Sequence, residues 1–169
     1  MDSRYNYWVI SDTHFGHEKM VRSGYRKEGF EEKIVRNCKH VIRECDMLIH
    51  TGDVAFYKNA HWHDKFLAEV RCKRSILVLG NHDRETLTWY YDRGWSFVCS
   101  KFELSIYGKY LIFSHRPIHQ KELPKGCINI HGHLHDGSYR TVTHQCERHR
   151  LVNIEKTMAP VTLKSLVGM

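Results

Sequence analysis

Short apolar runs alternate with amphipathic segments along the first half of the chain. Three of these runs end abruptly in polar residues and predict buried strands, at 7–10, 47–50 and 75–79. Residues 31–45 carry apolar side chains at helical spacing, and two glutamates stand at the start, where the helix dipole favours negative charge. Further helices are predicted after the second and third strands, around 62–70 and over 85–93. This alternation is typical of an α/β protein with a parallel sheet.

The second half of the chain has a different pattern, with closely spaced strands and few helices. The predicted strands are 97–100, 102–107, 110–114, 125–130 and 151–154. A short helix is expected after Pro160 and Thr162, and residues 15–30 read as a long basic loop with room for one helical turn. We therefore expect α/β layers in which the first part is parallel and the later part antiparallel.

Length and composition limit the classes of protein that fit this pattern. At roughly 150 residues per domain, the 169 residues predict a single domain over 1–169. Hydrophobic residues make up 41% and charged residues 27%, which excludes a disordered polyelectrolyte and a coiled coil. No apolar run approaches the roughly 18 residues of a membrane span, and the start of the chain lacks the apolar core of a signal peptide. Secretion and membrane insertion are therefore not expected.

Charge, cysteines and histidines bring candidate chemistry into this picture. The net charge of +7 should attract anions, so phosphate-bearing partners are plausible, although a scattered basic excess that serves only solubility fits equally well. The six cysteines form no C-x-x-C pair, and we interpret them as reduced core thiols of a cytoplasmic protein. The fourteen histidines are the unusual feature, because neutral imidazole is the commonest metal ligand in proteins.

Metal-binding residue types follow five of the apolar runs. They are Asp12 with His14, Asp53, Asn81 with His82 and Asp83, His115, and His133 with His135. In open α/β sheets the loops beyond the carboxyl ends of the strands line a common crevice. We therefore expect these side chains to converge, although they span more than half of the chain.

Spacing within these groups suggests how the ligands would be presented. Asp12 and His14 stand two positions apart on a chain leaving a strand, so in an extended conformation both side chains would point to one side and could chelate one ion. His133 and His135 repeat that spacing. Gly132 is expected to let the backbone pass close to the site, and Gly52 and Gly80 are expected to allow tight turns that aim Asp53 and Asn81 inward.

The number of candidate ligands predicts two metal ions. Two carboxylates, one amide and four imidazoles exceed what a single four-coordinate ion requires. If Asp53 bridges two ions, each ion has four protein ligands and room for water, as in two-metal phosphatases and nucleases. Two divalent ions outweigh the two aspartates in charge, so the centre would attract a phosphate ester anion.

The ordered set of motifs carries a family resemblance. Asp12-x-His14, Gly52-Asp53, Gly80-Asn81-His82-Asp83, Ser114-His115 and Gly132-His133-Leu134-His135 resemble the five blocks of the calcineurin-like metallophosphoesterases. That resemblance implies an α/β fold of two packed mixed β-sheets flanked by helices. It also implies one metal held by Asp12, His14, Asp53 and His135, and a second held by Asp53, Asn81, His115 and His133. His82 would then face the substrate, and Asp83 would orient it.

The remaining histidines have more ordinary interpretations, with two exceptions. His17 belongs to a run that resembles the opening of small single-domain phosphoesterases of bacteria and their phages, and we expect it and Arg116 to contact substrate. A separate zinc site at His144, Cys146 and His149 is a weaker alternative. It lacks a fourth ligand at the spacing typical of zinc fingers. His50 and His131 adjoin the motifs and are expected to be buried residues that support them. Surface or packing positions are expected for His40, His61 and His63, which lie on predicted helices.

The resemblance implies a metal-dependent phosphoric ester hydrolase. Members acting on phosphoproteins carry arginines beside their second and third blocks, whereas here Val54 follows Asp53 and Leu79 precedes Gly80. We therefore expect hydrolysis of phosphodiesters on nucleotides, nucleic-acid ends or small organic phosphates, by in-line attack of a metal-bound hydroxide. Manganese is the expected metal, with zinc, iron or nickel as alternatives. Phosphomonoester hydrolysis at the same site, and a non-catalytic nucleic-acid or zinc-binding module, stay open, and the oligomeric state is unassigned.

Overall fold

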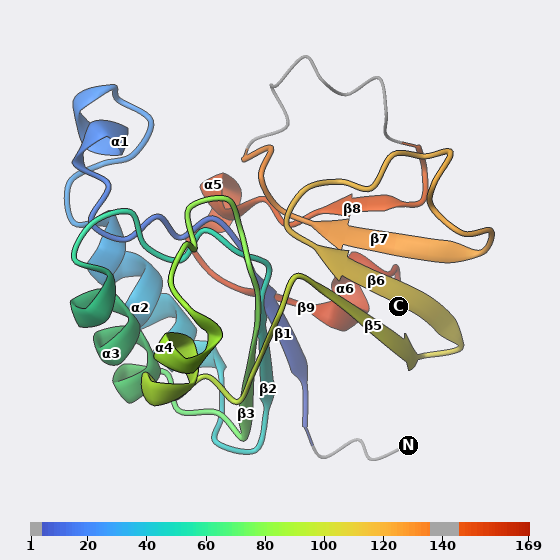
Figure 1. Ribbon diagram of the computed structural model, residues 1–169, viewed down its shortest axis with the longest axis horizontal. Helices are drawn as coiled ribbons and strands as arrows, with labels where there is room; N and C mark the ends of the chain where they lie inside the picture. The colour runs from blue at the N-terminus through green and yellow to red at the C-terminus, as the bar shows by residue number, and fades with distance from the viewer. Residues whose placement is uncertain (1–4, 136–145) are drawn as a thin grey trace.

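Two mixed β-sheets form the framework of the computed structural model, which describes residues 5–135 and 146–169 (Figure 1). The first sheet contains, in spatial order, β4 (Phe97–Cys99), β3 (Arg74–Val78), β2 (Met47–His50), β1 (Tyr7–Ile10) and β9 (Val161–Thr162). The second contains β5 (Lys101–Ile106), β6 (Lys109–Ser114), β7 (Cys127–His131) and β8 (His149–Leu151). In the first sheet β1 to β4 are parallel and β9 is antiparallel to β1. The two packed mixed sheets implied by the resemblance are thus confirmed.

Helices flank this framework. The described helices are α1 (Glu18–Arg22), α2 (Phe30–Val41), α3 (Asn59–Glu69), α4 (Leu87–Asp92), α5 (Ile154–Thr157) and α6 (Leu163–Leu166). In Figure 1, α2, α3 and α4 lie on the side of the first sheet that faces away from the second sheet. The first sheet is therefore covered on both faces.

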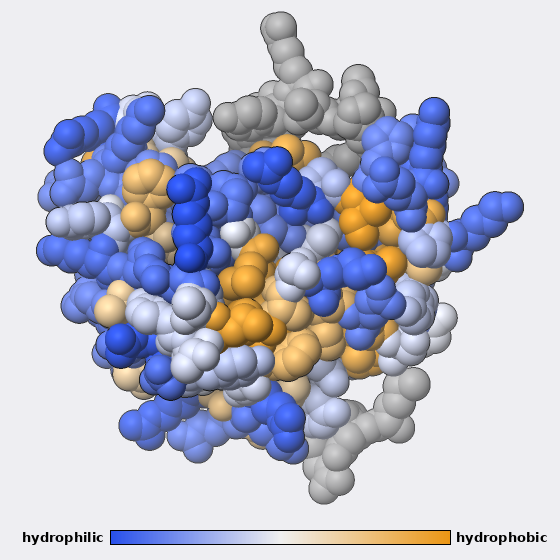
Figure 2. Space-filling model, viewed as in Figure 1, coloured by the Kyte–Doolittle hydropathy of each residue, from blue (hydrophilic) through white to orange (hydrophobic). Residues whose placement is uncertain are grey.

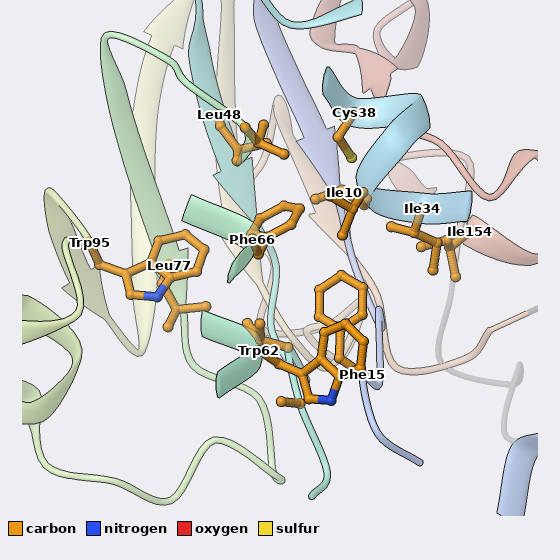
Figure 3. Close-up of a cluster of buried hydrophobic side chains, with 14 of the residues drawn as sticks. Ile10, Phe15, Ile34, Cys38, Leu48, Trp62, Phe66, Leu77, Trp95 and Ile154 are labelled. Atoms are coloured by element: carbon orange, nitrogen blue, oxygen red, sulfur yellow. The ribbon is translucent and has the colours of Figure 1, made fainter. Parts of the chain in front are cut away.

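This double cover explains why the strands of the first sheet read as continuous apolar runs. Alternate residues of one strand point to opposite faces. Ile10 packs with Phe66 of α3 and other residues of the helix side, in the cluster drawn in Figure 3. Its neighbour Val9 packs with Phe113 of β6 in a second cluster between the sheets. The first sheet is thus anchored from two sides, and the ends of its strands are held in place.

Several predicted elements end elsewhere than expected, for local reasons. The helix predicted over 31–45 ends at Val41, because Ile42 is extended and the buried Asp46 carboxylate accepts from the backbone N–H of Arg43 in the following turn. The strand predicted over 151–154 is also wrong, since β8 ends at Leu151 and α5 begins three residues later.

The expected antiparallel arrangement of the later strands is wrong for most of the second sheet. Only β5 and β6, joined by the turn at Gly108, pair antiparallel, while β6, β7 and β8 run parallel. Long connections separate the parallel strands, and such connections give a chain room to return to the same end of the sheet. The result places the carboxyl ends of β6 and β7 beside those of β1, β2 and β3.

The face shown in Figure 2 is largely hydrophilic, and the cysteines differ in burial. Hydrophilic side chains cover most of the face shown in Figure 2, and hydrophobic ones gather near its middle. The described part of the chain contains no helix with the length and hydropathy needed to cross a bilayer. All six cysteines are free thiols, but only Cys38 and Cys127 are buried, and Cys45 is exposed. The interpretation of all six as core thiols was therefore wrong for Cys45. The cytoplasmic location expected from the sequence stays a prediction.

Candidate metal centre

The seven candidate ligands come together where the two sheets meet. Each lies in a loop that leaves the carboxyl end of β1, β2, β3, β6 or β7. Within the first sheet, the backbone N–H of Asp12 donates to the carbonyl of Gly52 at 2.9 Å. Between the sheets, the N–H of His133 donates to Oδ2 of Asp12 at 2.9 Å. Backbone hydrogen bonds therefore hold these loops in register with each other.

The ligands form two clusters of three, with one carboxylate between them. Asp12, His14 and His135 make the first cluster, and Asp53, His115 and His133 make the second, each with donor atoms within 4.8 Å of one another. Oδ2 of Asp53 lies 3.6 Å from Nε2 of His14 and 3.3 Å from Nε2 of His115. It is therefore close to donor atoms of both clusters.

The second cluster gains an amide oxygen from another loop. Oδ1 of Asn81 lies 3.2 Å from Nε2 of His115, and the same ring nitrogen is 3.1 Å from Nδ1 of His133. These three donors approach one point from β3, β6 and β7. All three residues belong to the second ligand set implied by the resemblance, and their role as ligands stays a prediction.

The backbone at most of the candidate ligands has an unusual conformation. It is not the extended conformation that we predicted. Five of the seven candidate ligands have positive φ angles of 47° to 68°: Asp12, His14, Asp53, His133 and His135. Each such residue costs about 1–3 kcal/mol and persists only where the surrounding structure imposes it. Asp12 and His14 lie in one cluster, as the spacing predicted, whereas His133 and His135 belong to different clusters. The prediction of an extended backbone at both pairs was wrong.

Buried donor atoms without partners show that the first cluster suits a cation. Oδ1 of Asp12 and both ring nitrogens of His14 are buried and have no hydrogen-bond partner among the described residues. Nε2 of His14 and Oδ1 of Asp12 are 3.8 Å apart. Leaving such atoms unpaired in a protein interior is costly, and a metal ion between them would satisfy both.

Electrostatics place three of these groups in the protonation state that binds metal and shift three others away from it. Burial holds the pKa of His14 far below its usual value and lowers that of His133 to about 4, so both rings are neutral at pH 7. Burial alone would raise the pKa of Asp53, but hydrogen bonding and charge from His115 and the His82 N–H hold it below its usual range. The Asp53 carboxylate is thus ionised, and the His14 and His133 rings have lone pairs to donate. Burial alone would lower the pKa values of His115 and His135, but hydrogen bonds to Asp53 and Glu155 raise them, and burial raises the pKa of Asp12.

Glycine is required where two loops cross the ligands. A Cβ atom on Gly80 would collide with Oδ1 of Asp53, and one on Gly132 would collide with Oδ2 of Asp12. Close backbone approach is a use that only glycine permits. The expectation for Gly132 is confirmed, and at Gly80 the need is for close approach and not for a left-handed turn.

His82 lies at the open side of the centre, outside both clusters. Its side chain is 30% exposed, and Nε2 is 3.9 Å from Oδ2 of Asp53. We expected Asp83 to orient this ring. Instead the Asp83 carboxylate accepts from the backbone N–H groups of Asp53, Val54 and Gly80. Asp83 therefore joins the loops after β2 and β3, and its burial raises its pKa to about 6 despite those bonds.

A partly buried ion pair that was not predicted from the sequence lies behind the first cluster. Arg26 donates to the backbone carbonyls of Asp12 and Thr13 at 2.7 and 2.6 Å, and to Oε1 of Glu155 at 2.6 Å. Oε1 of Glu155 in turn lies 3.0 Å from Nδ1 of His135. A carboxylate on the far nitrogen of a ligand histidine fixes the ring orientation and its tautomer. Neither residue lies in a recognisable motif, so no sequence signal pointed to them.

Glu155→Gln should weaken the binding of one metal ion by about 10- to 100-fold, the usual effect of losing such a supporting partner. The substitution keeps the size of the side chain but removes the charge that faces His135. Calorimetric titration of the metal-free protein with manganese measures it. Glu147→Gln, which removes an exposed carboxylate, is the matched control. Equal affinities for Glu155→Gln and wild type would show that Glu155 does not support His135.

The other residues singled out from the sequence occupy varied places. The ring of His17 lies 5.4 Å from that of His14, and exposed Arg116 follows His115 directly. Both are at the edge of the centre. Buried His50 bonds to Thr13 and Gly52, as expected for a supporting residue.

Away from the centre, the remaining histidines divide between surface and packing. His40 and His61 are exposed, and buried His63 accepts from the indole of Trp95. Buried His131 bonds to the backbone of the next residue. Of the alternative zinc site, His144 lies outside the described residues, and Sγ of Cys146 is 3.5 Å from Nδ1 of His149. Neither of those two belongs to a candidate metal cluster among the described residues.

Comparison with known proteins is consistent with this geometry. The sequence model of the calcineurin-like phosphoesterases matches residues 5–160. An uncharacterised protein of Methanocaldococcus jannaschii is 26% identical over 133 residues, which are 76% of this chain and 68% of the relative. A solved protein of unknown function from Aquifex aeolicus superimposes with a TM-score of 0.78 at 22% identity, covering 98% of this chain and 99% of that one. The match extends over nearly the whole of both chains, so the two proteins share the fold.

Proposed function

The chain belongs to the calcineurin-like phosphoesterase family, and from that premise we propose that it hydrolyses phosphodiesters at a two-metal centre. The observation that carries the proposal is the position of Asp53, whose Oδ2 lies within 3.6 Å of ring nitrogens from both clusters. A carboxylate so placed can bridge two cations. The substrates we propose are nucleotides, nucleic-acid ends or small organic phosphates, with phosphomonoesters as the alternative for the same site.

Two sets of four residues would hold the ions. One set is Asp12, His14, Asp53 and His135, and the other is Asp53, Asn81, His115 and His133. When bound, the ions would offset the negative charge of the phosphate and activate a water molecule for in-line attack. The donors are nitrogen and oxygen without thiolate, which suits manganese and also fits zinc, iron or nickel.

The protein's own hydroxyl groups support attack by water over attack by a side chain. Thr13 donates to the carbonyl of Val54 at 2.7 Å, and Ser114 donates to the carbonyl of Arg116 at 2.7 Å. A nucleophilic hydroxyl needs its own base and a free path to phosphorus. Both hydroxyls are instead committed to backbone carbonyls, so a covalent phosphoenzyme is not part of the proposal.

His82 supplies the proton chemistry in this account. Its backbone N–H donates to Oδ1 of Asp53 at 2.8 Å, which fixes the residue beside the bridge and leaves the ring partly exposed to substrate. From there the ring can donate to a phosphoryl oxygen or protonate the leaving oxygen. Protonation matters most for diesters of ordinary alcohols, whose alkoxides leave poorly. Arg116 and His17, at the rim, would contact the substrate.

Hydrolysis of bis-p-nitrophenyl phosphate in the presence of manganese should exceed hydrolysis of phosphopeptides, because Val54 follows Asp53 and Leu79 precedes Gly80 where phosphoprotein-acting members carry arginines. Initial rates on both substrates, with p-nitrophenyl phosphate as the monoester, measure the preference. A diester that is chiral at phosphorus tests the attack step, because direct in-line attack by water should invert the configuration. Faster turnover of phosphopeptides would contradict the substrate class. Net retention of configuration would contradict direct attack by water, and no turnover with any metal would favour a non-catalytic binding module.

A further inference from the structure

Two consecutive aromatic side chains are exposed beside the metal centre. Phe56 is 47% exposed and Tyr57 is 62% exposed, although aromatic rings of this size are usually buried. The ring of Phe56 stacks on His17 with centroids 3.9 Å apart and an interplanar angle of 8°. It also meets His82 edge to face, at 4.9 Å between centroids. Phe56 therefore touches the residue that faces the substrate.

An open pocket continues from Phe56 away from the metal centre. Its volume of about 420 Å³ falls in the ~300–1,000 Å³ range of small-molecule sites. Its walls include Phe56, Tyr57, Lys58, Asn59, Glu85 and Trp89. Nδ2 of Asn59 donates to Glu85 at 3.4 Å, which ties the start of α3 to the segment before α4. Aromatic faces thus line a pocket that also offers an amide, a carboxylate and a lysine.

This combination fits a nucleobase better than an aliphatic group. Every base has a π face that stacks on an aromatic side chain, and amide and carboxylate groups can meet its polar edge. Isolated exposed aromatic residues need no explanation, but these three line one pocket, and Phe56 contacts His17 and His82 beside the centre. Resting on the proposed function, we infer that the pocket lined by Phe56, Tyr57 and Trp89 binds the base of a nucleoside whose phosphodiester lies at the metal centre.

Tyr57 is the residue on which to test this inference, because among the described residues Phe56, and not Tyr57, makes the ring contacts with His17 and His82. The substrates are thymidine 5′-p-nitrophenyl phosphate and methyl p-nitrophenyl phosphate, which release the same p-nitrophenolate and differ only in the nucleoside. Wild-type manganese-loaded protein should prefer the thymidine ester in kcat/KM. Tyr57→Ala should reduce that preference by about tenfold, mainly through KM, as expected for loss of one stacking ring.

Conservative variants separate stacking from a merely structural role. Tyr57→Phe should keep the preference, because the ring remains, and Tyr57→Leu should lose it. Tyr110→Ala removes an exposed aromatic ring on the second sheet and should leave the preference at the wild-type value. Equal kcat/KM for the two esters in wild type, or an unchanged preference in Tyr57→Ala, would overturn the inference.

A binding measurement distinguishes failure of the inference from failure of the proposed function. Thymidine 5′-monophosphate and methyl phosphate are titrated into manganese-loaded protein by calorimetry. The nucleotide should bind more tightly than methyl phosphate, and Tyr57→Ala should lower the affinity for the nucleotide by about tenfold. If neither ester is hydrolysed but this difference is found, the proposed hydrolysis fails and the base pocket stands. If both esters are hydrolysed and no difference is found, the pocket fails alone.

Discussion

Replacing His82 with alanine should lower turnover by about two to four orders of magnitude while metal content stays at the wild-type level, since that is the usual range for removing a general acid. The ring lies outside both ligand clusters, with Nε2 3.9 Å from Oδ2 of Asp53. The backbone N–H that orients Asp53 is still present in alanine. Metal analysis and steady-state rates on the same preparation measure the two effects.

Substrates with different leaving groups distinguish the two possible roles of His82. If the ring protonates the leaving oxygen, His82→Ala should lose more activity on a dinucleotide, which releases an alkoxide, than on bis-p-nitrophenyl phosphate. If the ring binds a phosphoryl oxygen, the two losses should be equal. His40→Ala, which removes an exposed imidazole from α2, is the matched control and should keep full activity. Near-normal turnover of His82→Ala on both substrates would contradict any role in the reaction.

Asp53→Asn should weaken metal binding by more than about 100-fold, beyond the range for losing an outer partner of a ligand. Asp53 is the only carboxylate whose oxygen approaches ring nitrogens of both clusters among the described residues. Asparagine keeps the shape but removes the charge that two cations would share. Calorimetric titration with manganese measures the affinity, and circular dichroism checks that the variant is folded.

Removing an unrelated carboxylate provides the control for this prediction. Asp92→Asn lies at the exposed end of α4 and should bind metal as wild type does. An Asp53→Asn protein that still binds two ions with unchanged affinity would show that the carboxylate is not shared. Hydrolysis should fall in parallel with binding, since both ions would depend on the same side chain.

The parts of the fold that could be predicted are those set by local pattern. The strands at 7–10 and 47–50 have the predicted bounds because each is buried on both faces and ends at a polar loop. The order of polar residues after the strands also predicted that the candidate ligands would converge, and the structure places them together. Their roles as ligands stay predictions.

The features that escaped prediction depend on contacts distant in sequence. Arg26 and Glu155 are 129 positions apart, and only the folded chain brings them behind His135. The direction of the later strands depends on how long loops return across the molecule. The positive φ angles of ligands such as Asp12 are imposed by the loops that surround them. The spacing of residues in the sequence does not reveal which loops surround them.

Stepwise reconstitution tests the two-metal account most directly. Metal-free protein is titrated with manganese while bound metal per chain and hydrolysis of bis-p-nitrophenyl phosphate are measured on the same samples. Binding should saturate at two ions per chain, and activity should appear as the second ion binds, because both clusters flank Asp53. Saturation at one ion with full activity would contradict the shared centre, and saturation at two ions without hydrolysis would contradict the proposed diester hydrolysis.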